Sequence, residues 1–348
     1  MSGLVRDAYR DIELYDPKRS PCAVDLSDNT NLFGVAPSVV KLMAAIPSAL
    51  ITRYPPVFAD ELKQALARRH NVDAANITTG CGSDDVIDSA MRAFAEPGAR
   101  VVYPAPTFGI IPTFARMNAA APVQIVSNSD FSVDAAKLRD ARAAFTYLCT
   151  PNNPTGLRVS TDTVERLDAE LGGVLLLDEA YADFSDVDLA GFAAASQRTI
   201  SLRTMSKACG LAGLRVGYAI GPAALVREIE KSRGPYKVSA VADAAARGIL
   251  SADAQWVDDV VRQTRANRGR LADRLQQLGL TFWPSAANFI LIKLPAGRTA
   301  DDVNTSLRAG GVAVRPFAGL PHAGDCIRVT VGPWEMMETF LERLVAVL

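Results

Sequence analysis

A lysine stands where a buried strand ends, in the segment Thr204-Met205-Ser206-Lys207-Ala208, which follows the apolar run Ile200 to Leu202. In open α/β sheets, ligands bind at the carboxyl ends of the strands. A lysine placed there points into the ligand crevice, and burial disfavours its charged form, so the neutral amine becomes available as a nucleophile. Considered alone, Lys207 is more typical of a solvated surface lysine. The residue types in the surrounding segments decide between a buried nucleophile and a solvated surface lysine.

Two nearby segments have the character of a phosphate site. Arg215 lies among glycines in the segment Gly210 to Tyr218, and with the Thr204 and Ser206 hydroxyls it would form an anion site. A surface arginine in a glycine-rich loop is the alternative. The second segment, Gly80-Cys81-Gly82-Ser83-Asp84-Asp85, lies between a strand near residue 77 and a helix from residue 84, and amides at a helix start bind phosphate. A dinucleotide fingerprint needs glycine where Asp85 stands, so this segment predicts a single phosphate cradle.

Polar side chains also follow two other predicted strands. Asp178 ends the apolar run Val174 to Leu177, and a buried carboxylate needs a cationic partner. A protonated pyridine nitrogen would be such a partner and would keep the ring an electron sink, with Tyr181 bonded to a ring hydroxyl. A helix-capping aspartate is the alternative. The turn after the strand Phe145 to Cys149 presents Asn153, whose amide could donate to the ring oxygen.

The elements that position these residues alternate along the chain. Short apolar or β-branched runs bounded by Pro, Gly or polar residues predict strands, and amphipathic stretches between them predict helices. This alternation predicts an α/β fold with a doubly wound, mostly parallel sheet. The predicted strands lie near residue 77 and at 101–103, 145–149, 174–177, 200–202, 288–293 and 327–331, and the predicted helices at 61–69, 84–95, 161–171, 253–280, 301–308 and from 334.

Three parts are expected along the 348 residues. Residues 1–37 are rich in Pro and Asp and predict an arm that packs on the small domain or on a partner subunit. Residues 38–252 form the predicted large domain. Residues 253–348 form the smaller C-terminal α/β domain, which begins with a long charged helix.

Composition excludes several classes of protein. Lys+Arg is 37 and Asp+Glu is 38, so the net charge of −1 gives no electrostatic reason to expect nucleic acid or an anionic membrane as partner. The five scattered cysteines favour a reducing cytoplasm over a disulfide framework, and with only two histidines no histidine-rich metal cluster is expected. No apolar run suggests a signal peptide or a membrane span.

Taken together, these segments resemble the fold-type I pyridoxal phosphate enzymes of the aspartate aminotransferase superfamily. Within it they are most similar to the histidinol-phosphate aminotransferase branch. Each motif is weak alone, but their joint occurrence in this order is specific. The segments that carry the resemblance are Leu26 to Asn31 with Gly34, Arg53-Tyr54-Pro55, Gly82-Ser83-Asp84, Pro106-Thr107-Phe108, Asn152 to Gly156, Asp178 to Tyr181, Ser206 to Tyr218, Ala287-Asn288-Phe289, Gly311 to Arg315 and Ile327 to Thr330.

The resemblance implies pyridoxal 5′-phosphate as cofactor and a role for each residue of the set. Lys207 would bind the cofactor covalently and move a proton, Asp178 would pair with the ring nitrogen, and Tyr181 would hold the ring oxygen together with Asn153. Phe108 would stack on the ring. The cofactor phosphate would be bound by the amides of Ser83 and Asp84, the hydroxyls of Thr204 and Ser206, and Arg215, with Tyr54 reaching it from the neighbouring subunit of a homodimer.

The substrate is implied less directly. Arg328 would bind an α-carboxylate as a bidentate pair, Arg315 would meet a substrate phosphate, and Tyr15 and Asn31 of the arm would shape the pocket. The leading reading is transamination of L-histidinol phosphate with 2-oxoglutarate, a step of histidine biosynthesis. An aromatic amino acid aminotransferase, which would dispense with phosphate recognition, and a threonine-phosphate decarboxylase are the alternatives. Departures from the branch, Asn29-Thr30-Asn31 and Lys237 to Ser239, fall in regions that shape the substrate pocket.

Overall fold

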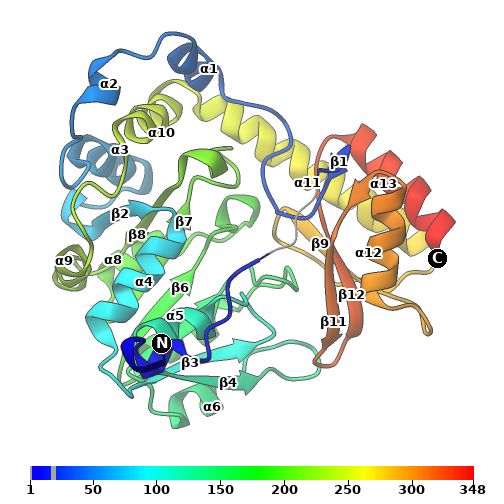
Figure 1. Ribbon diagram of the computed structural model, residues 1–348, viewed down its shortest axis with the longest axis horizontal. Coiled ribbons are helices and arrows are strands. Elements are labelled where there is room, and N and C mark those ends of the chain that lie inside the picture. The colour runs from blue at the N-terminus through cyan, green and yellow to red at the C-terminus, as the bar shows by residue number, and fades with distance from the viewer. Residues whose placement is uncertain (1, 17–20) are drawn as a thin grey trace.

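A long helix, α11 (Ala254–Gln277), runs between two separate sheets in the computed structural model (Figure 1). The structure describes residues 2–16 and 21–348, so residues 1 and 17–20 of the predicted arm lie outside the described residues. No helix in the described part of the chain is long and apolar enough to cross a membrane.

The larger sheet has seven strands in the order β2-β8-β7-β6-β5-β3-β4. Strand β8 is antiparallel to both of its neighbours, and all other pairs are parallel, which confirms the predicted α/β fold with a mostly parallel sheet. The strands are β2 (Ile77–Cys81), β3 (Arg100–Ala105), β4 (Ala121–Val126), β5 (Phe145–Cys149), β6 (Val174–Asp178), β7 (Thr199–Thr204) and β8 (Val216–Ile220).

Side chains alternate between the two faces of this sheet, because successive residues of a strand point to opposite sides. Tyr147, Leu176 and Leu202 belong to the core beneath α4, whereas Leu148 and Leu177 belong to the core beneath α6 and α7. Continuing the alternation by two residues places Asp178 and Thr204 on the α4 side. The strand ends therefore direct these two polar side chains toward the start of α4.

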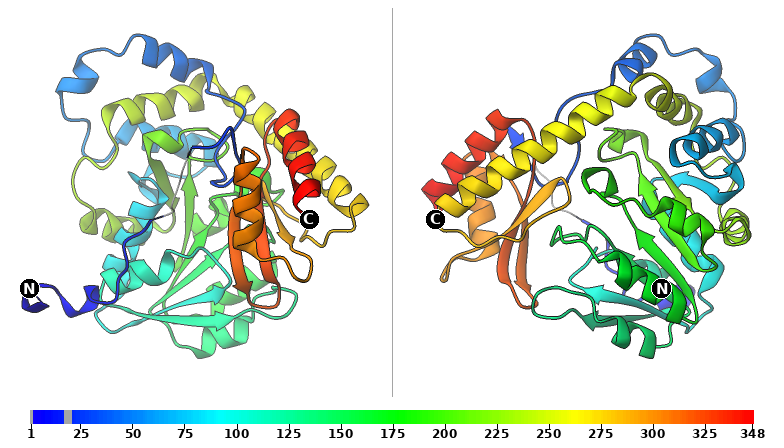
Figure 2. Two further views of the ribbon diagram at one scale, coloured as in Figure 1. Left: turned by 45° about the vertical axis from the view of Figure 1, so that its right-hand side comes forward. Right: turned by 180° about the vertical axis from the view of Figure 1, so that it is seen from behind.

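The smaller sheet has three antiparallel strands in the order β11-β12-β9 and packs against α12 and α13. Its strands are β9 (Phe289–Lys293), β11 (Arg315–Leu320) and β12 (Gly324–Thr330). The arm contributes β1 (Val24–Asp25), which pairs in parallel with β10 (Val312–Ala313) beside this sheet. Figure 2 shows the two ends of the arm far apart, and its second 3-10 turn, η2 (Asp7–Tyr9), packs against α5 beside the larger sheet.

The helices complete the layers around the two sheets. Figure 1 shows α1, α2, α3 and α10 gathered at one end of the larger sheet, away from the smaller one. The helices are α1 (Pro37–Ala44), α2 (Ala49–Thr52), α3 (Asp60–His70), α4 (Ser83–Phe94), α5 (Ile111–Met117), α6 (Ala135–Asp140), α7 (Thr161–Glu170), α8 (Ala190–Ala195), α9 (Ala223–Ser232), α10 (Ala240–Ala252), α12 (Ala300–Ala309) and α13 (Trp334–Val347).

Strand β8 is the main feature that the sequence pattern hid. The segment Gly210 to Tyr218 has the glycine content of a loop, but only its first part is one, and Val216 begins a strand buried along its whole length. Gly217 shows why this strand contains a glycine. A Cβ atom there would lie 2.2 Å from the carbonyl carbon of Gly82 and 2.3 Å from the amide nitrogen of Ser83. The glycine is needed for close packing of the strand against the β2–α4 turn.

Candidate active site

Lys207 lies three residues beyond the end of β7, with its side chain partly buried. Its Nζ donates a hydrogen bond to the carbonyl oxygen of Asp28 at 3.1 Å and lies 5.7 Å from the centre of the Tyr181 ring. Burial, with the nearby positive charge of Arg328 adding to it, lowers the pKa of Lys207 to about 8. An amine in this environment loses its proton more readily than one in water.

Asp178 is a buried carboxylate without a cationic partner among the described residues, with only 4% of its surface exposed. Its two oxygens accept hydrogen bonds from the Tyr147 hydroxyl at 2.6 Å and from the Ala180 amide at 3.0 Å. Burial nevertheless raises its pKa to about 6. A carboxylate in this state would be stabilised by a bound cation.

The Tyr181 hydroxyl accepts a hydrogen bond from Asn29 Nδ2 at 3.1 Å. Burial raises the pKa of Tyr181 to about 12, so the hydroxyl keeps its proton at neutral pH and can donate it. Asn29 is fixed in turn by the small-sheet side of the molecule: its amide donates to Thr330 Oγ1 at 2.9 Å, and its carbonyl accepts from Asn288 at 3.0 Å. The arm therefore connects Tyr181 to strands of the smaller sheet.

The start of α4 forms a cradle for an anion. Gly82 precedes the helix with a φ of +81°, and no side chain caps the first turn, so its amides remain available. A Cβ atom on Gly82 would lie 2.4 Å from the Arg215 guanidinium, so glycine is what lets that guanidinium reach the helix start. Thr204 and Ser206 are buried and share a hydroxyl hydrogen bond of 3.0 Å. Thr204 lies opposite Gly217 in the β7–β8 register, and Gly217 packs on the turn before α4, so Thr204 lies near the same helix start.

Arg328 is buried and points into the space between the two sheets. One of its nitrogens donates to Asn153 Oδ1 and another to the carbonyl of Ser27 at 2.7 Å, while Nε has no partner among the described residues. Burial lowers the pKa of Arg328 to about 10, and the charge of Arg315 adds to this effect. Arg315 is directly opposite Arg328 in the β11–β12 register, and no hydrogen bond or ion pair in the described part of the chain involves its side chain.

Phe108 and Tyr15, two further predicted residues, differ in how deeply they are buried. Phe108 is half-buried, next to Thr107, whose hydroxyl donates to Asn152 at 2.8 Å. Tyr15 is 68% exposed but close enough to Arg328 to influence the pKa of the guanidinium.

Asn31 contacts the loop that carries Lys207, whereas Tyr54 lies on the surface of the chain. Both polar atoms of Asn31 are engaged by backbone groups, those of Ala208 and Phe33, so it holds the arm against the lysine loop. Tyr54 is 83% exposed and stacks on Tyr236 at 4.7 Å between ring centres.

Four further residues were not among the predicted site residues. Tyr147 supports Asp178, and the signal was a tyrosine hydroxyl inside a buried strand, which requires a buried partner. Asn29, two residues before the predicted Asn31, is the arm residue that contacts Tyr181. Glu179 and Arg203 form a buried ion pair of 2.9 Å that links the ends of β6 and β7, and only the three-dimensional pairing of these strands reveals it.

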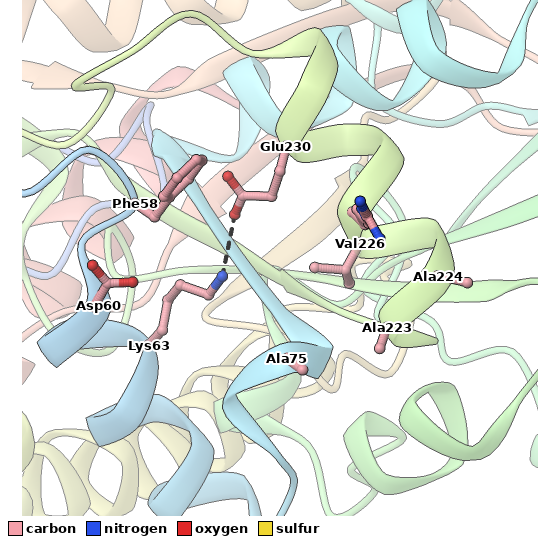
Figure 3. Close-up of a pocket in the computed structure, with 9 residues that line it drawn as sticks. Phe58, Asp60, Lys63, Ala75, Ala223, Ala224, Val226 and Glu230 are labelled. Atoms are coloured by element: carbon pink, nitrogen blue, oxygen red, sulfur yellow. Dashed lines mark hydrogen bonds and ion pairs between the residues drawn. The ribbon is translucent and has the colours of Figure 1, made fainter.

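A separate cavity of about 500 Å³ lies on the outside of the larger sheet between α3 and α9 (Figure 3). Its wall combines apolar side chains such as Phe58 and Val226 with the ion pair Lys63–Glu230, whose charged atoms are 3.4 Å apart. None of the residues that line it belongs to the predicted site.

Comparisons with known proteins agree with this geometry. The sequence model of the family "Aminotransferase class I and II" matches residues 22–344. Histidinol-phosphate aminotransferase 1 of Nostoc is 33% identical over 94% of this chain and 92% of its own length. Histidinol-phosphate aminotransferase of Ruminiclostridium cellulolyticum is 33% identical over 99% and 98%. The solved structure of histidinol-phosphate aminotransferase from Sinorhizobium meliloti in complex with pyridoxal-5′-phosphate superimposes with a TM-score of 0.89, at 26% identity over 99% of this chain and 97% of that one.

Proposed function

Because the chain belongs to the class I and II aminotransferases, we propose that it transfers the amino group of L-histidinol phosphate to 2-oxoglutarate, yielding imidazole acetol phosphate and L-glutamate. It is a pyridoxal phosphate-dependent aminotransferase. The names of its relatives support the substrate, and the pair Arg315–Arg328 is the structural observation that carries it.

The residues present fit the cofactor. Asp178 is buried without a cation among the described residues and would bind the protonated ring nitrogen. The uncapped start of α4, with Gly82 and Gly217 leaving room for backbone and guanidinium, would hold the phosphate through Ser83, Asp84, Thr204, Ser206 and Arg215. When bound, the cofactor supplies an electron sink for the carbon that carries the reacting amine.

The chain's own groups then orient the reactants and move protons. Lys207 takes up and releases a proton at Nζ, which its lowered pKa permits near neutral pH. Tyr181 would donate to the ring oxygen, and Asn153, whose Oδ1 accepts from Arg328, would offer its Nδ2 to the same oxygen. Phe108 would pack against the ring face. Tyr147 and Ala180 hold the Asp178 carboxylate in place.

Two guanidinium groups side by side suit a doubly charged ligand. Histidinol phosphate carries a phosphate monoester and no carboxylate, whereas glutamate carries two carboxylates. Arg328 and Arg315 can therefore share one phosphate in the first half-reaction and take one carboxylate each in the second. Tyr15, from the arm, would close the pocket over them. A substrate with a single carboxylate and an aromatic ring would leave Arg315 without a partner.

A homodimer belongs to the same proposal. Tyr54 is exposed on the outer face of its own chain, and a group that binds the cofactor phosphate from a neighbouring subunit would have this position. We also propose a division into an arm (1–37), a large domain (38–252) and a small domain (253–348), supported by the pairing of β1 with β10 and by the start of α11 at Ala254. The five free cysteines support a reducing cytoplasm.

Half-reaction spectroscopy tests the substrate. The purified holoenzyme should show a visible absorbance band that borohydride reduction abolishes and that the Lys207→Ala variant lacks. Histidinol phosphate should convert this band at least about tenfold more efficiently, in kcat/KM, than phenylalanine or threonine phosphate. Preference for phenylalanine would indicate an aromatic aminotransferase, and carbon dioxide release from threonine phosphate would indicate a decarboxylase.

A further inference from the structure

The proposed phosphate cradle contains an electrostatic conflict. The first turn of α4 carries two adjacent carboxylates, Asp84 and Asp85, at the helix end that would hold the cofactor phosphate. Acidic residues stabilise a helix start by themselves, but they repel a phosphate bound at the same amides. Burial raises the pKa of Asp84, a sign that negative charge is disfavoured in this place. Binding of a phosphate dianion therefore requires that both carboxylates be neutralised.

Each carboxylate has its own cation. Arg215 lies 3.3 Å from Asp84 and is itself one of the proposed phosphate ligands. Asp85 is paired with a different residue, Lys237, whose Nζ lies 2.5 Å from Oδ1. The other oxygen of Asp85 accepts the Cys81 amide at 2.9 Å, so this carboxylate also closes the turn between β2 and α4.

We propose that Lys237 is a positioning residue for the cofactor phosphate: it neutralises Asp85, so that the start of α4 remains attractive to a dianion. Lys237 comes from the connection between α9 and α10, 152 residues away from Asp85 in sequence. Its side chain is 26% exposed and that of Asp85 13%, so water screens the pair incompletely. The inference rests on the proposed phosphate cradle.

Two other cations near this connection are engaged by a different carboxylate. Arg233 pairs with Glu230 at 3.0 Å. Lys63 lies 3.4 Å from the same carboxylate (Figure 3). Tyr236, just before Lys237, stacks on Tyr54. The connection therefore places one neutralising charge and one aromatic support close to groups assigned to the cofactor phosphate.

Binding of pyridoxal phosphate and of pyridoxal to the apoenzyme separates this role from a purely structural one. Pyridoxal lacks the phosphate but retains the ring and aldehyde. In Lys237→Met, equilibrium dialysis should show about tenfold weaker binding of pyridoxal phosphate, the change expected from one unneutralised charge close to a bound dianion. Binding of pyridoxal should change less than twofold. The loss should shrink as salt is added.

A second substitution provides the rescue. Asp85→Asn keeps an oxygen for the Cys81 amide but removes the charge, so it should bind pyridoxal phosphate at least as tightly as the wild type. The double variant Lys237→Met/Asp85→Asn should recover wild-type affinity within about twofold. Lys63→Met is the matched control, because it breaks another partly buried ion pair, with Glu230, and should leave the affinity unchanged.

The outcomes are distinct. An unchanged affinity in Lys237→Met, a double variant that stays weak, or an equal loss for pyridoxal would overturn the proposal. If Lys237→Met does not fold, Asp85→Asn alone decides, since a purely structural ion pair predicts weaker binding and neutralisation predicts equal or tighter binding. Arg215→Met tests the cradle separately: an unchanged affinity there would show that the phosphate site itself is misplaced.

Discussion

Arg315 and Arg328 stand directly opposite each other on β11 and β12, two like charges in adjacent antiparallel strands. Like charges placed directly opposite each other destabilise a sheet. Arg328 is buried and its pKa is lowered to about 10, so its charge is already disfavoured by burial. An arrangement that is unfavourable in the protein alone becomes favourable when an anion lies between the two guanidinium groups.

Replacing Arg315 tests that interpretation. Arg315→Met should reduce kcat/KM for histidinol phosphate by about 10- to 100-fold, the loss expected for one or two charge-assisted hydrogen bonds. The reaction with phenylalanine should change much less. Thermal unfolding of the apoprotein should show equal or slightly higher stability, because one of two like charges is removed.

The control for Arg315 is Lys293→Met, which removes an exposed cation from β9, another strand of the same sheet. It should leave both reactions unchanged. Equal losses for the phosphate and the aromatic substrate in Arg315→Met would contradict phosphate recognition by this residue.

The pKa of Lys207, lowered to about 8, predicts a pH dependence in the apoenzyme. Modification by an amine-selective reagent, mapped by mass spectrometry, should accelerate with a midpoint near pH 8. Arg328→Met should move the midpoint upward, since the arginine charge disfavours the ammonium form. Because the folded pKa lies below that of the unfolded chain, the apoprotein should gain stability as the pH rises from about 8 to 10.5. A midpoint near that of an ordinary lysine would contradict the buried environment.

Asp178→Asn should have opposite effects on stability and on function. Burial raises the pKa of Asp178 from 3.8 to about 6, so ionisation destabilises the apoprotein progressively from about pH 4 and fully above about pH 6. At pH 7.5 the variant should unfold with a free energy on the order of 2–3 kcal/mol higher, a gain that disappears below pH 4. Its kcat with histidinol phosphate should fall by at least about a hundredfold. Denaturant titrations at pH 4 and 7.5 would measure the first effect.

The shared-site dimer can be tested by complementation. Tyr54→Ala should weaken cofactor binding, and Lys207→Ala should be inactive. Mixed dimers of the two variants contain one site with an intact lysine and an intact Tyr54 from the other chain. Cofactor affinity at that site should return to the wild-type value if Tyr54 acts across the interface. Affinity that stays at the level of Tyr54→Ala would place the tyrosine in the site of its own chain.

The sequence predicts best those parts of the site that depend on a single strand. Asp178 ends an apolar strand, whose two-residue alternation determines the face toward which the carboxylate points. Lys207 follows another apolar strand by three residues, so its place at the carboxyl end of the sheet could be inferred, although its direction could not. The chemistry at these positions could therefore be inferred before the sheet was known. Strand β8 was hidden because close packing required Gly217, and glycine is read as a loop residue.

Contacts between distant segments could not be predicted in the same way. The register of Arg315 and Arg328 depends on a hairpin with an irregularity between Phe317 and Leu320, which the pattern of residue types does not determine. The bond from Asn29 to Tyr181 depends on where the arm lies, and a shift of two residues separates it from the predicted Asn31. Such contacts are fixed by tertiary packing rather than by local propensity.

The arm also determines when the site can be completed during synthesis. β1 and the residues after it are among the first to leave the ribosome, but Asn29 bonds to Thr330, 301 residues later in the chain. At about 5–20 residues per second, that interval is roughly 15–60 s. All strands of the larger sheet have been synthesised well before then. Lys207 still lacks its bond to the Asp28 carbonyl, because the arm that contains Asp28 is not yet held by the smaller sheet. Assembly of the catalytic centre is thus expected to be the last event of folding, after the greater part of the protein has already formed.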